Sequence, residues 1–222
     1  MQLAIFDLDH TLLSGDSDQL WCNFLIGCGR LPMHSSEAAA EVALRYTAGT
    51  IAPLEYCQFF ASMISGSTLG ELASLRRRFL DEVVRDRIPE DARALLRRHR
   101  EAGDILVLTT ATNRIVSELT AKELQMDHYL CTELEVVEDR ITGRILGEPN
   151  MGTGKLKRLR AWLPSAGYSE ELLKQASFYS DSINDLSLLS VVGRPIVVDP
   201  DVRLEGAAWR KHWAVLRLHR ER

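Results

Sequence analysis

A short apolar run near the start of the chain ends on two aspartates. Residues 3–6 (Leu-Ala-Ile-Phe) are typical of a strand buried on both faces of a sheet, and Asp7, Asp9, His10 and Thr11 come soon after them. Ligands of open parallel sheets bind just beyond the carboxyl ends of the strands. Two carboxylates there repel each other unless a cation or a proton lies between them. The segment therefore predicts a Mg²⁺ site containing a nucleophilic aspartate; the alternative is a strand followed by an Asp-rich turn.

The composition is that of an ordinary globular protein. The 222 residues allow one large domain, or one domain with an insert. The net charge of -4 gives no reason to expect a nucleic-acid partner. Arginine-rich segments at 76–78 and 97–100 are interpreted as solvated faces of helices rather than as a surface for phosphate backbones.

The cysteines and the hydropathy pattern indicate a cytoplasmic protein. Cys22, Cys28, Cys57 and Cys131 form no CxxC motif and complete no zinc-binding pattern with the histidines, so we expect reduced, packed thiols. The N-terminal segment has neither the basic region nor the long apolar core of a signal peptide. No stretch approaches eighteen uninterrupted apolar residues, so no membrane partner is expected.

Residues 16–87 have the periodicity of helices rather than of strands. Apolar stripes predict four helices, over 16–29, 34–49, 53–65 and 68–87. Gly29, Gly49 and Gly66 stand where helix ends favour a left-handed residue. We interpret the segment as a helical bundle inserted after the first strand and lying over the mouth of the sheet. The expected domains are a core of residues 1–14 and 87–222 and a cap of residues 15–86.

From Pro89 onward, strand and helix patterns alternate, which predicts an α/β fold with a parallel sheet. Residues 133–146 differ, because β-branched residues on both sides of 138–140 predict an antiparallel hairpin. The expected strands are 105–108, 129–132, 177–180, 196–198 and 213–218, and the expected helices are 90–102, 113–126, 153–163, 169–176, 183–192 and 200–211.

Three of these strands end on polar residues that suit phosphoryl transfer. They deliver Asp7 with Asp9, Thr110, and Asp181 to one edge of the sheet. Asp7 is the candidate nucleophile, and Asp7 and Asp181 with a backbone carbonyl suit the coordination of Mg²⁺. Asp9 is the candidate general acid, which would protonate the leaving alkoxide and then activate a water. Thr110, with the amides that open the next helix, predicts a phosphate seat.

Two further residues complete this candidate site. Asp185 lies four residues after Asp181, so one turn of helix would place both on the same face, where Asp185 could hold a metal-bound water. Lys155 follows a Gly-Thr-Gly sequence at a helix start. A P-loop is excluded, because position 149 is proline and position 156 is leucine. A surface lysine is the alternative, but the glycine context and the need for a phosphate-binding cation favour a functional role.

Four segments, in this order, resemble the motifs of the haloacid dehalogenase-like hydrolases: Phe6 to Thr11, Leu108 to Thr110, Lys155, and Asp181 to Asp185. The helical insert resembles that of the phosphoserine-phosphatase-like branch. The resemblance implies a Rossmann-like core with helices on both faces and a Mg²⁺-dependent phosphomonoesterase that forms an aspartyl-phosphate on Asp7. It also implies that Asp7, the backbone oxygen of Asp9 and Asp181 hold the metal, and that Asn184 helps to hold the substrate.

The resemblance also bears on the substrate. In phosphoserine phosphatases an acid nine residues after the nucleophile faces the substrate amine, and this position is Asp16 here; a helix N-cap is the alternative, and one residue could do both. The usual double glycine after the second motif is Ala111-Thr112, which changes the floor of the pocket. Gly-Asp-Ser-Asp at 15–18 and Thr-Ala-Thr-Asn at 110–113 resemble a bacterial group that includes histidinol-phosphate phosphatases. Asp16 could pair with the amine of that substrate, and aromatic residues of the cap could hold its imidazole.

The expected function is thus hydrolysis of a small, amine-bearing phosphorylated metabolite by a monomer or homodimer, with histidinol phosphate favoured and phosphoserine the alternative. A receiver-type signalling domain also uses acids, Thr and Lys around Mg²⁺. Receivers are about half this length, however, and place the phosphorylated aspartate after the acid pair. A domain that has kept the metal site but lost turnover is a third reading, which the complete set of motifs disfavours.

Overall fold

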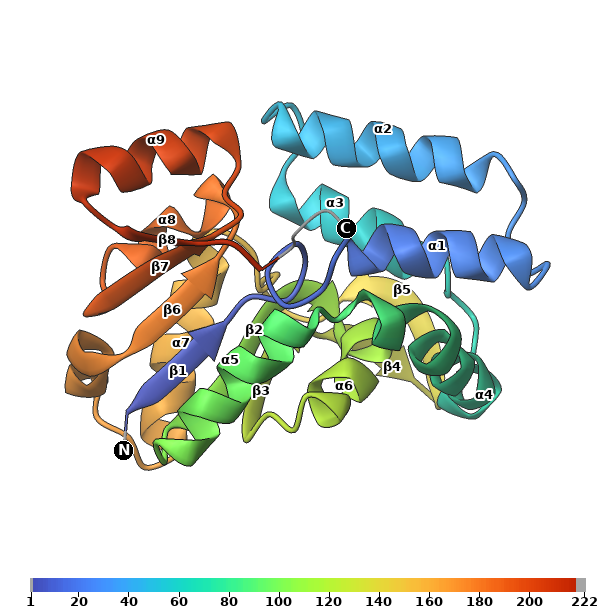
Figure 1. The fold of residues 1–222 in the computed structure, drawn as a ribbon. Helices are drawn as coiled ribbons and strands as arrows, with labels where there is room; N and C mark the ends of the chain where they lie inside the picture. Colours follow the sequence, from blue (N-terminus) through green and yellow to red (C-terminus); the bar gives the residue numbers. More distant parts are fainter. Residues whose placement is uncertain (1, 219–222) are drawn as a thin grey trace.

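The computed structural model describes residues 2–218, and a six-stranded parallel sheet forms its centre (Figure 1). The strand order is β3–β2–β1–β6–β7–β8, so the connections change direction next to β1. Such a switch point opens a crevice at the carboxyl ends of the strands. The strands are β1 (Leu3–Phe6), β2 (Ile105–Asn113), β3 (His128–Thr132), β6 (Ser177–Ser180), β7 (Arg194–Val198) and β8 (Ala214–Leu216).

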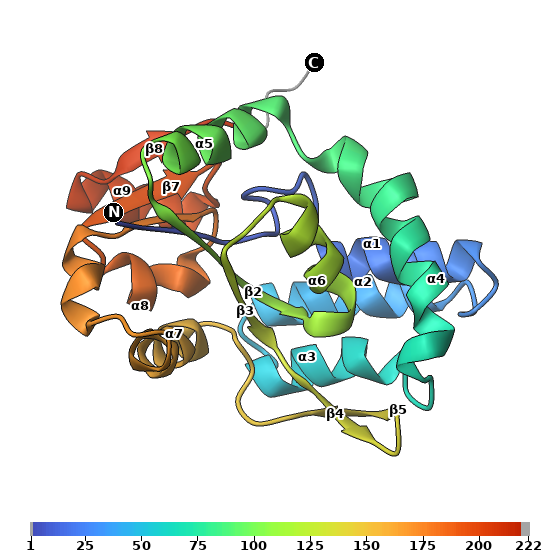
Figure 2. The same ribbon diagram turned by 90° about the horizontal axis from the view of Figure 1, so that it is seen from below.

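The alternation of side chains along the strands places helices on both faces of the sheet. Leu3 and Ile5 pack on one face, and Ala4 and Phe6 pack on the other. The first face is covered by α7 (Thr153–Ser165), α8 (Leu186–Leu189) and α9 (Val202–Lys211), and the second by α5 (Glu90–Glu101) and α6 (Arg114–Glu123). Figure 2 shows α5 and α7 on opposite sides of the strands. The predicted α/β class, with a parallel sheet and helices on both faces, is confirmed.

The helical segment between β1 and β2 has an apolar cluster of its own and also joins the main core. It contains α1 (Ser17–Gly27), α2 (Ser35–Thr47), α3 (Pro53–Ser62) and α4 (Leu69–Phe79), grouped on the side to which β1 runs (Figure 1). Cys22, Ala39 and Phe60 belong to the separate cluster. Trp21 and Phe79 pack edge to face, with ring centroids 5.0 Å apart, and belong to the same cluster as the core strands. Part of the cap is therefore anchored on the core.

The predicted antiparallel hairpin is confirmed as β4 (Leu134–Val137) and β5 (Arg140–Ile145). It binds the cap through its backbone. The amide of Gly66 donates to the carbonyl of Ile141 at 2.7 Å, and the amide of Ile141 donates to the carbonyl of Ser67 at 3.0 Å. The hairpin thus ties the segment between α3 and α4 to the core.

Several predicted elements have different bounds. The helix expected over 68–87 stays α-helical only to Phe79 and continues as a π-helical segment (Leu80–Val84) and a 3₁₀ turn (Arg85–Arg87). The helix expected over 183–192 is a 3₁₀ turn (Ile183–Asp185) followed by the short α8, and the helix expected over 169–176 is 3₁₀ throughout (Glu170–Gln175). Apolar periodicity does not separate these helix types, because all of them place residues three to five apart on one face.

The second strand is longer than predicted and reaches Asn113 instead of ending at Leu108. Its extension contains three threonines, whose β-branched side chains favour extended backbone. Asn113 is then the N-cap of α6, because its side-chain oxygen accepts hydrogen bonds from the amides of Ile115 and Val116.

Two remaining expectations concern cysteines and membranes. All four cysteines, each within the described residues, are free thiols. Within residues 2–218, no helix combines the length and the apolar character that crossing a membrane requires.

Candidate active site

Two glycines place Lys155 in the first turn of α7. Gly152 has φ of +57°, a conformation that residues with a Cβ rarely adopt. A Cβ on Gly154 would lie 2.2 Å from the carbonyl oxygen of Pro149, so only glycine fits there. The side-chain amide nitrogen of Asn150 donates to the carbonyl of Thr110 at 2.9 Å and fixes the loop before α7 to the end of β2. The glycine context of Lys155 is therefore a packing requirement that directs the lysine inward.

Lys155 bridges two buried aspartates from different strand ends. Its ammonium donates to Oδ1 of Asp7 at 2.7 Å and to Oδ2 of Asp185 at 2.8 Å. Burial lowers the pKa of Lys155, but the negative charges of Asp185 and Asp7 outweigh it and raise the pKa above its usual value. The ammonium is therefore charged across the physiological range. Breaking such a buried pair costs about 3–5 kcal/mol, because one charge is left uncompensated.

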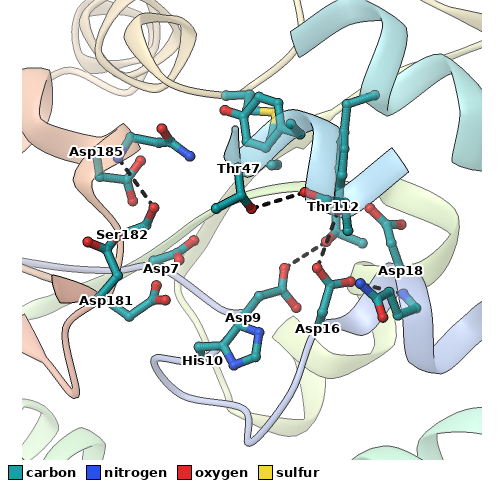
Figure 3. Close-up of a pocket in the computed structure, with 18 of the residues that line it drawn as sticks. Asp7, Asp9, His10, Asp16, Asp18, Thr47, Thr112, Asp181, Ser182 and Asp185 are labelled. Atoms are coloured by element: carbon teal, nitrogen blue, oxygen red, sulfur yellow. Dashed lines mark hydrogen bonds between the residues drawn. The ribbon is translucent and has the colours of Figure 1, made fainter. Parts of the chain in front are cut away.

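Asp7, Asp181 and Asp185 form one acidic group on one side of the cavity (Figure 3), and their charges act on one another and on Lys155. Burial and the charges of Asp185 and Asp9, opposed by Lys155, raise the pKa of Asp7 to about 7. Burial and the charges of Asp7 and Asp185 raise the pKa of Asp181 well above its usual value. Lys155 alone does not compensate three carboxylates, so this group has the charge and the oxygen donors to hold a divalent cation.

The donor set fits Mg²⁺ only if it includes backbone oxygen. Within the described part of the chain, no group of three or more His, Cys, Asp or Glu side chains is arranged to hold a metal by itself. Mg²⁺ is usually held by one or two carboxylates, with waters or substrate phosphate completing the octahedron. Asp7, Asp181 and the carbonyl of Asp9 match that pattern, and they stay the predicted ligands.

Asp9 lies between this acidic group and the cap (Figure 3). Its Oδ1 accepts a hydrogen bond from the amide of Ser17 at 2.7 Å, and its Oδ2 accepts one from the hydroxyl of Thr112 at 2.9 Å. The hydroxyls of Ser17 and Thr112 are 2.8 Å apart, which joins the start of α1 to the end of β2. A cap helix and a core strand together hold this carboxylate in place.

Asp16 is the N-cap of α1, as one of the two sequence readings predicts. Its Oδ1 accepts from the amide of Gln19 at 2.9 Å, and its Oδ2 accepts from the hydroxyl of Tyr56 at 3.3 Å. Burial and the charge of Asp9 raise its pKa to about 6. Asp16 also lines the cavity, so capping and substrate binding are compatible.

A cavity of about 770 Å³ joins these groups, and both the core and the cap line it. Residues of α1, α2 and α3 face residues from the carboxyl ends of β1, β2 and β6 across it. The predicted site residues among its lining are Asp7, Asp9, Asp16, Lys155, Asp181, Asn184 and Asp185. All five predicted acids, the lysine and Asn184 are thus brought to one place.

Two predicted residues lie differently from what the sequence reasoning supposed. Thr110 is fully buried; its hydroxyl lies 3.5 Å from Oδ2 of Asp9, and Ala111 and Thr112 line the cavity beside it. The reason for pairing Asp185 with Asp181 is wrong, because the chain between them is not a turn of α-helix. Asp185 instead binds Lys155 and accepts a hydrogen bond from the hydroxyl of Ser180 at 2.7 Å.

Sequence reasoning assigned no role to Asp18, Thr112 or Asn150. Asp18 is an acid at the second position of a helix, which ordinarily indicates only a favourable interaction with the helix dipole. Thr112 stands where the family usually has the second of two glycines. This difference indicated a changed pocket floor, but it did not show which group the Thr112 hydroxyl binds. No sequence pattern pointed to Asn150, because its hydrogen bonds are to strand ends that are distant in sequence.

A family model described as haloacid dehalogenase-like hydrolase matches residues 4–190. The chain belongs to this family. The hydrolase is 35% identical over 216 residues to a histidinol-phosphatase of Neisseria meningitidis serogroup C (strain 8013), covering 96% of this chain and 97% of that protein. It is 31% identical to phosphoserine phosphatase SerB1 of Mycobacterium tuberculosis (strain ATCC 25618 / H37Rv), covering 96% of this chain and 69% of the relative.

The fold of this hydrolase also matches a solved structure. A protein of unknown function from Bordetella pertussis Tohama I has 34% sequence identity and a TM-score of 0.92, covering 98% of this chain and 99% of that one. The resemblance to the phosphoserine-phosphatase-like branch and the prediction of a phosphatase-type enzyme are confirmed by the family and its relatives.

Proposed function

We propose that this hydrolase is a Mg²⁺-dependent phosphomonoesterase that forms an aspartyl-phosphate on Asp7. The arrangement of Lys155 carries the proposal: one ammonium binds Asp7 and Asp185, beside Asp181 and Asp9, at the carboxyl ends of the strands. A carboxylate, a fixed cation and an oxygen-only donor set are the parts that transfer of a phosphoryl group to a carboxylate requires.

In the first step Asp7 attacks the phosphorus of the ester. Lys155 binds Oδ1 of Asp7, which leaves Oδ2 to form the new P–O bond. The bond from phosphorus to the ester oxygen breaks, and its electron pair goes to the leaving alkoxide, which takes a proton from Asp9. Bound Mg²⁺ would neutralise phosphate oxygens and so lower the repulsion between the ester and Asp7.

In the second step Asp9 acts as a base. Its carboxylate takes a proton from a water molecule, whose oxygen attacks the phosphorus of the aspartyl-phosphate. The bond to Asp7 breaks, so inorganic phosphate is released and the Asp7 carboxylate is restored. Because Ser17 and Thr112 hold the Asp9 carboxylate, it is positioned for both proton transfers.

The remaining predicted residues have supporting roles in this proposal. Thr110 and Asn184 would help to seat the phosphate and the substrate. Asp185 binds Lys155 and would hold a water of the metal when Mg²⁺ is bound. A cavity of about 770 Å³ is of the size that small metabolites occupy, so a small phosphorylated metabolite is the proposed partner.

The substrate proposed first is histidinol phosphate. The relative named histidinol-phosphatase covers nearly the whole chain, which supports this choice. The cavity lining also includes an acid, Asp16, that could bind the substrate amine, and two aromatic side chains, Tyr46 and Tyr56, that could contact an imidazole. Phosphoserine is the second candidate, because of the relative named phosphoserine phosphatase.

Side-by-side steady-state assays of histidinol phosphate, phosphoserine and an aryl phosphate test the proposal. We expect Mg²⁺-dependent release of phosphate from all three, with the highest kcat/KM for histidinol phosphate. In Asp16→Ala, KM should rise far more for the two amine-bearing esters than for the aryl phosphate. Equal effects on all three would reduce Asp16 to a helix cap, and no phosphate release from any ester would refute the phosphatase function.

A further inference from the structure

Asp18 lines the cavity at its cap end and has an unsatisfied carboxylate oxygen. Its residue is only 4% exposed, yet it lines the cavity. Among the described residues, its buried Oδ1 has no hydrogen-bond partner. Buried carboxylate oxygens almost always have a partner, because removal from water is costly when nothing replaces the lost hydrogen bonds. An unsatisfied carboxylate in the lining of a binding cavity indicates that a ligand supplies the missing donor.

Asp16 differs from Asp18 in this respect. Both oxygens of Asp16 already accept hydrogen bonds, from the amide of Gln19 and the hydroxyl of Tyr56. Asp16 therefore orders the start of α1 and contributes negative charge, whereas Asp18 has the open acceptor. In Figure 3 the two carboxylates lie on the same side of the cavity, away from Asp7.

Within residues 2–218, no lysine or arginine pairs with these two acids. Three basic side chains line the cavity within the described residues, namely His10, Lys155 and Arg203. Lys155 is held by the two core aspartates described above, and Arg203 is an exposed residue of α9 on the core side. His10 is exposed on the loop after β1, and its charge acts on Asp16 only as a secondary effect after burial and Asp9.

We propose that Asp18 is a specificity-determining residue that binds a protonated nitrogen of the substrate. Together with Asp16, it would exclude esters that carry a carboxylate next to that nitrogen. The proposal rests on the phosphatase function proposed above and narrows its substrate class to phosphate esters of amino alcohols without a carboxylate. Attraction selects the cation, and repulsion between like charges rejects its carboxylated analogue.

Three small esters test the substrate class with the wild-type enzyme. 2-Aminoethyl phosphate has the amine alone, phosphoserine adds a carboxylate to it, and ethyl phosphate lacks both groups. We expect kcat/KM for 2-aminoethyl phosphate to exceed each of the other two values by about tenfold to a hundredfold. A preference for phosphoserine over 2-aminoethyl phosphate would overturn the proposal.

The variant Asp18→Asn tests the residue. Asparagine keeps the size of the side chain but removes its charge, so the ratio of kcat/KM between 2-aminoethyl phosphate and ethyl phosphate should fall about tenfold or more, mainly through KM. Asp86→Asn is the matched control: it removes the same charge from an exposed residue that does not line the cavity, and should leave the ratio unchanged.

The outcomes separate this proposal from the one on which it rests. If the wild-type enzyme hydrolyses none of the esters, the phosphatase function fails and the role of Asp18 fails with it. If the esters are hydrolysed but Asp18→Asn keeps the wild-type ratio, only the role of Asp18 is refuted. If Asp18→Asn does not fold, the wild-type comparison of 2-aminoethyl phosphate with phosphoserine decides alone.

Discussion

The ammonium of Lys155 lies 2.7 Å from Oδ1 of Asp7, although 148 positions separate the two residues in sequence. Asp7 directly follows β1, and Lys155 lies in the first turn of α7, the helix that follows the hairpin. Their contact is a charged hydrogen bond between the end of β1 and the start of α7, and it is almost completely buried. The arrangement of the acids depends on this lysine.

Lys155→Met should impair both folding and turnover. Methionine keeps most of the side-chain volume but leaves Asp7 and Asp185 without their cation, so we expect a loss of about 3–5 kcal/mol in the free energy of unfolding. Urea denaturation monitored by circular dichroism measures this loss. Lys157→Met is a suitable control, because Lys157 is exposed and, within the described part of the chain, pairs only with Glu148 at the surface. Equal stability of the two variants would show that the buried bridge is not structural.

Asp9→Asn should slow hydrolysis while leaving the substrate bound. An amide can neither protonate the leaving alkoxide nor activate water, so kcat should fall by about 10²- to 10⁴-fold. The loss should be smaller for an aryl phosphate with a good leaving group than for an alkyl phosphate, because the first step then needs little proton transfer. The same loss for both esters would argue against Asp9 as the acid.

Mg²⁺ should be required for turnover and should stabilise the fold. A cation that binds beside Asp7 and Asp181 relieves their mutual repulsion, so Tm should rise with Mg²⁺ concentration. EDTA should abolish activity, and added Mg²⁺ should restore it. If Asp181 is a metal ligand, Mg²⁺ should leave the Tm of the Asp181→Asn variant unchanged. Full activity in EDTA would contradict the metal site.

The stability of the substrate-free protein should fall as pH rises, partly because of Asp18. Burial, then the charges of Asp16 and Asp9, raise the pKa of Asp18 in the folded state. From about pH 4, where an ordinary aspartate titrates, the unfolded chain releases this proton and the substrate-free folded chain retains it, so stability is lost with rising pH. A substrate cation bound beside Asp18 favours the ionised carboxylate and lowers this pKa, so the proton leaves on binding. Asp18→Asn should therefore raise Tm by a few degrees at neutral pH and less near pH 4, as measured by calorimetry without Mg²⁺. A lower Tm than wild type at both pH values would contradict this account.

The core of the site could be predicted from sequence because each residue ends a recognisable element. Asp7 follows an apolar run and Asp181 follows the segment Ser-Phe-Tyr-Ser; both segments are strands, and parallel strands bring such ends together. The prediction for Lys155 rested on the sequence Gly-Thr-Gly-Lys. The structure explains its two glycines: one has a positive φ, and the other has no space for a Cβ.

The cap side could not be predicted in the same way. The burial of Asp18 depends on how α1 and α3 pack, and no local pattern distinguishes a buried acid in a first helical turn from an exposed one. The partner of Asp185 also depends on tertiary contacts, since Ser180 and Lys155 reach it from two other elements. The assumption of regular α-helix after Asp181 was wrong because a 3₁₀ turn has the same apolar pattern.

The most direct test of the account is acid quenching of the wild-type enzyme during turnover, followed by mass spectrometry of its peptides. The account predicts one phosphoryl group on the peptide that contains Asp7, which alkaline hydroxylamine removes and which is absent from Asp7→Asn. Turnover without any phosphorylated peptide, or with the phosphoryl group on another residue, would contradict Asp7 as the nucleophile.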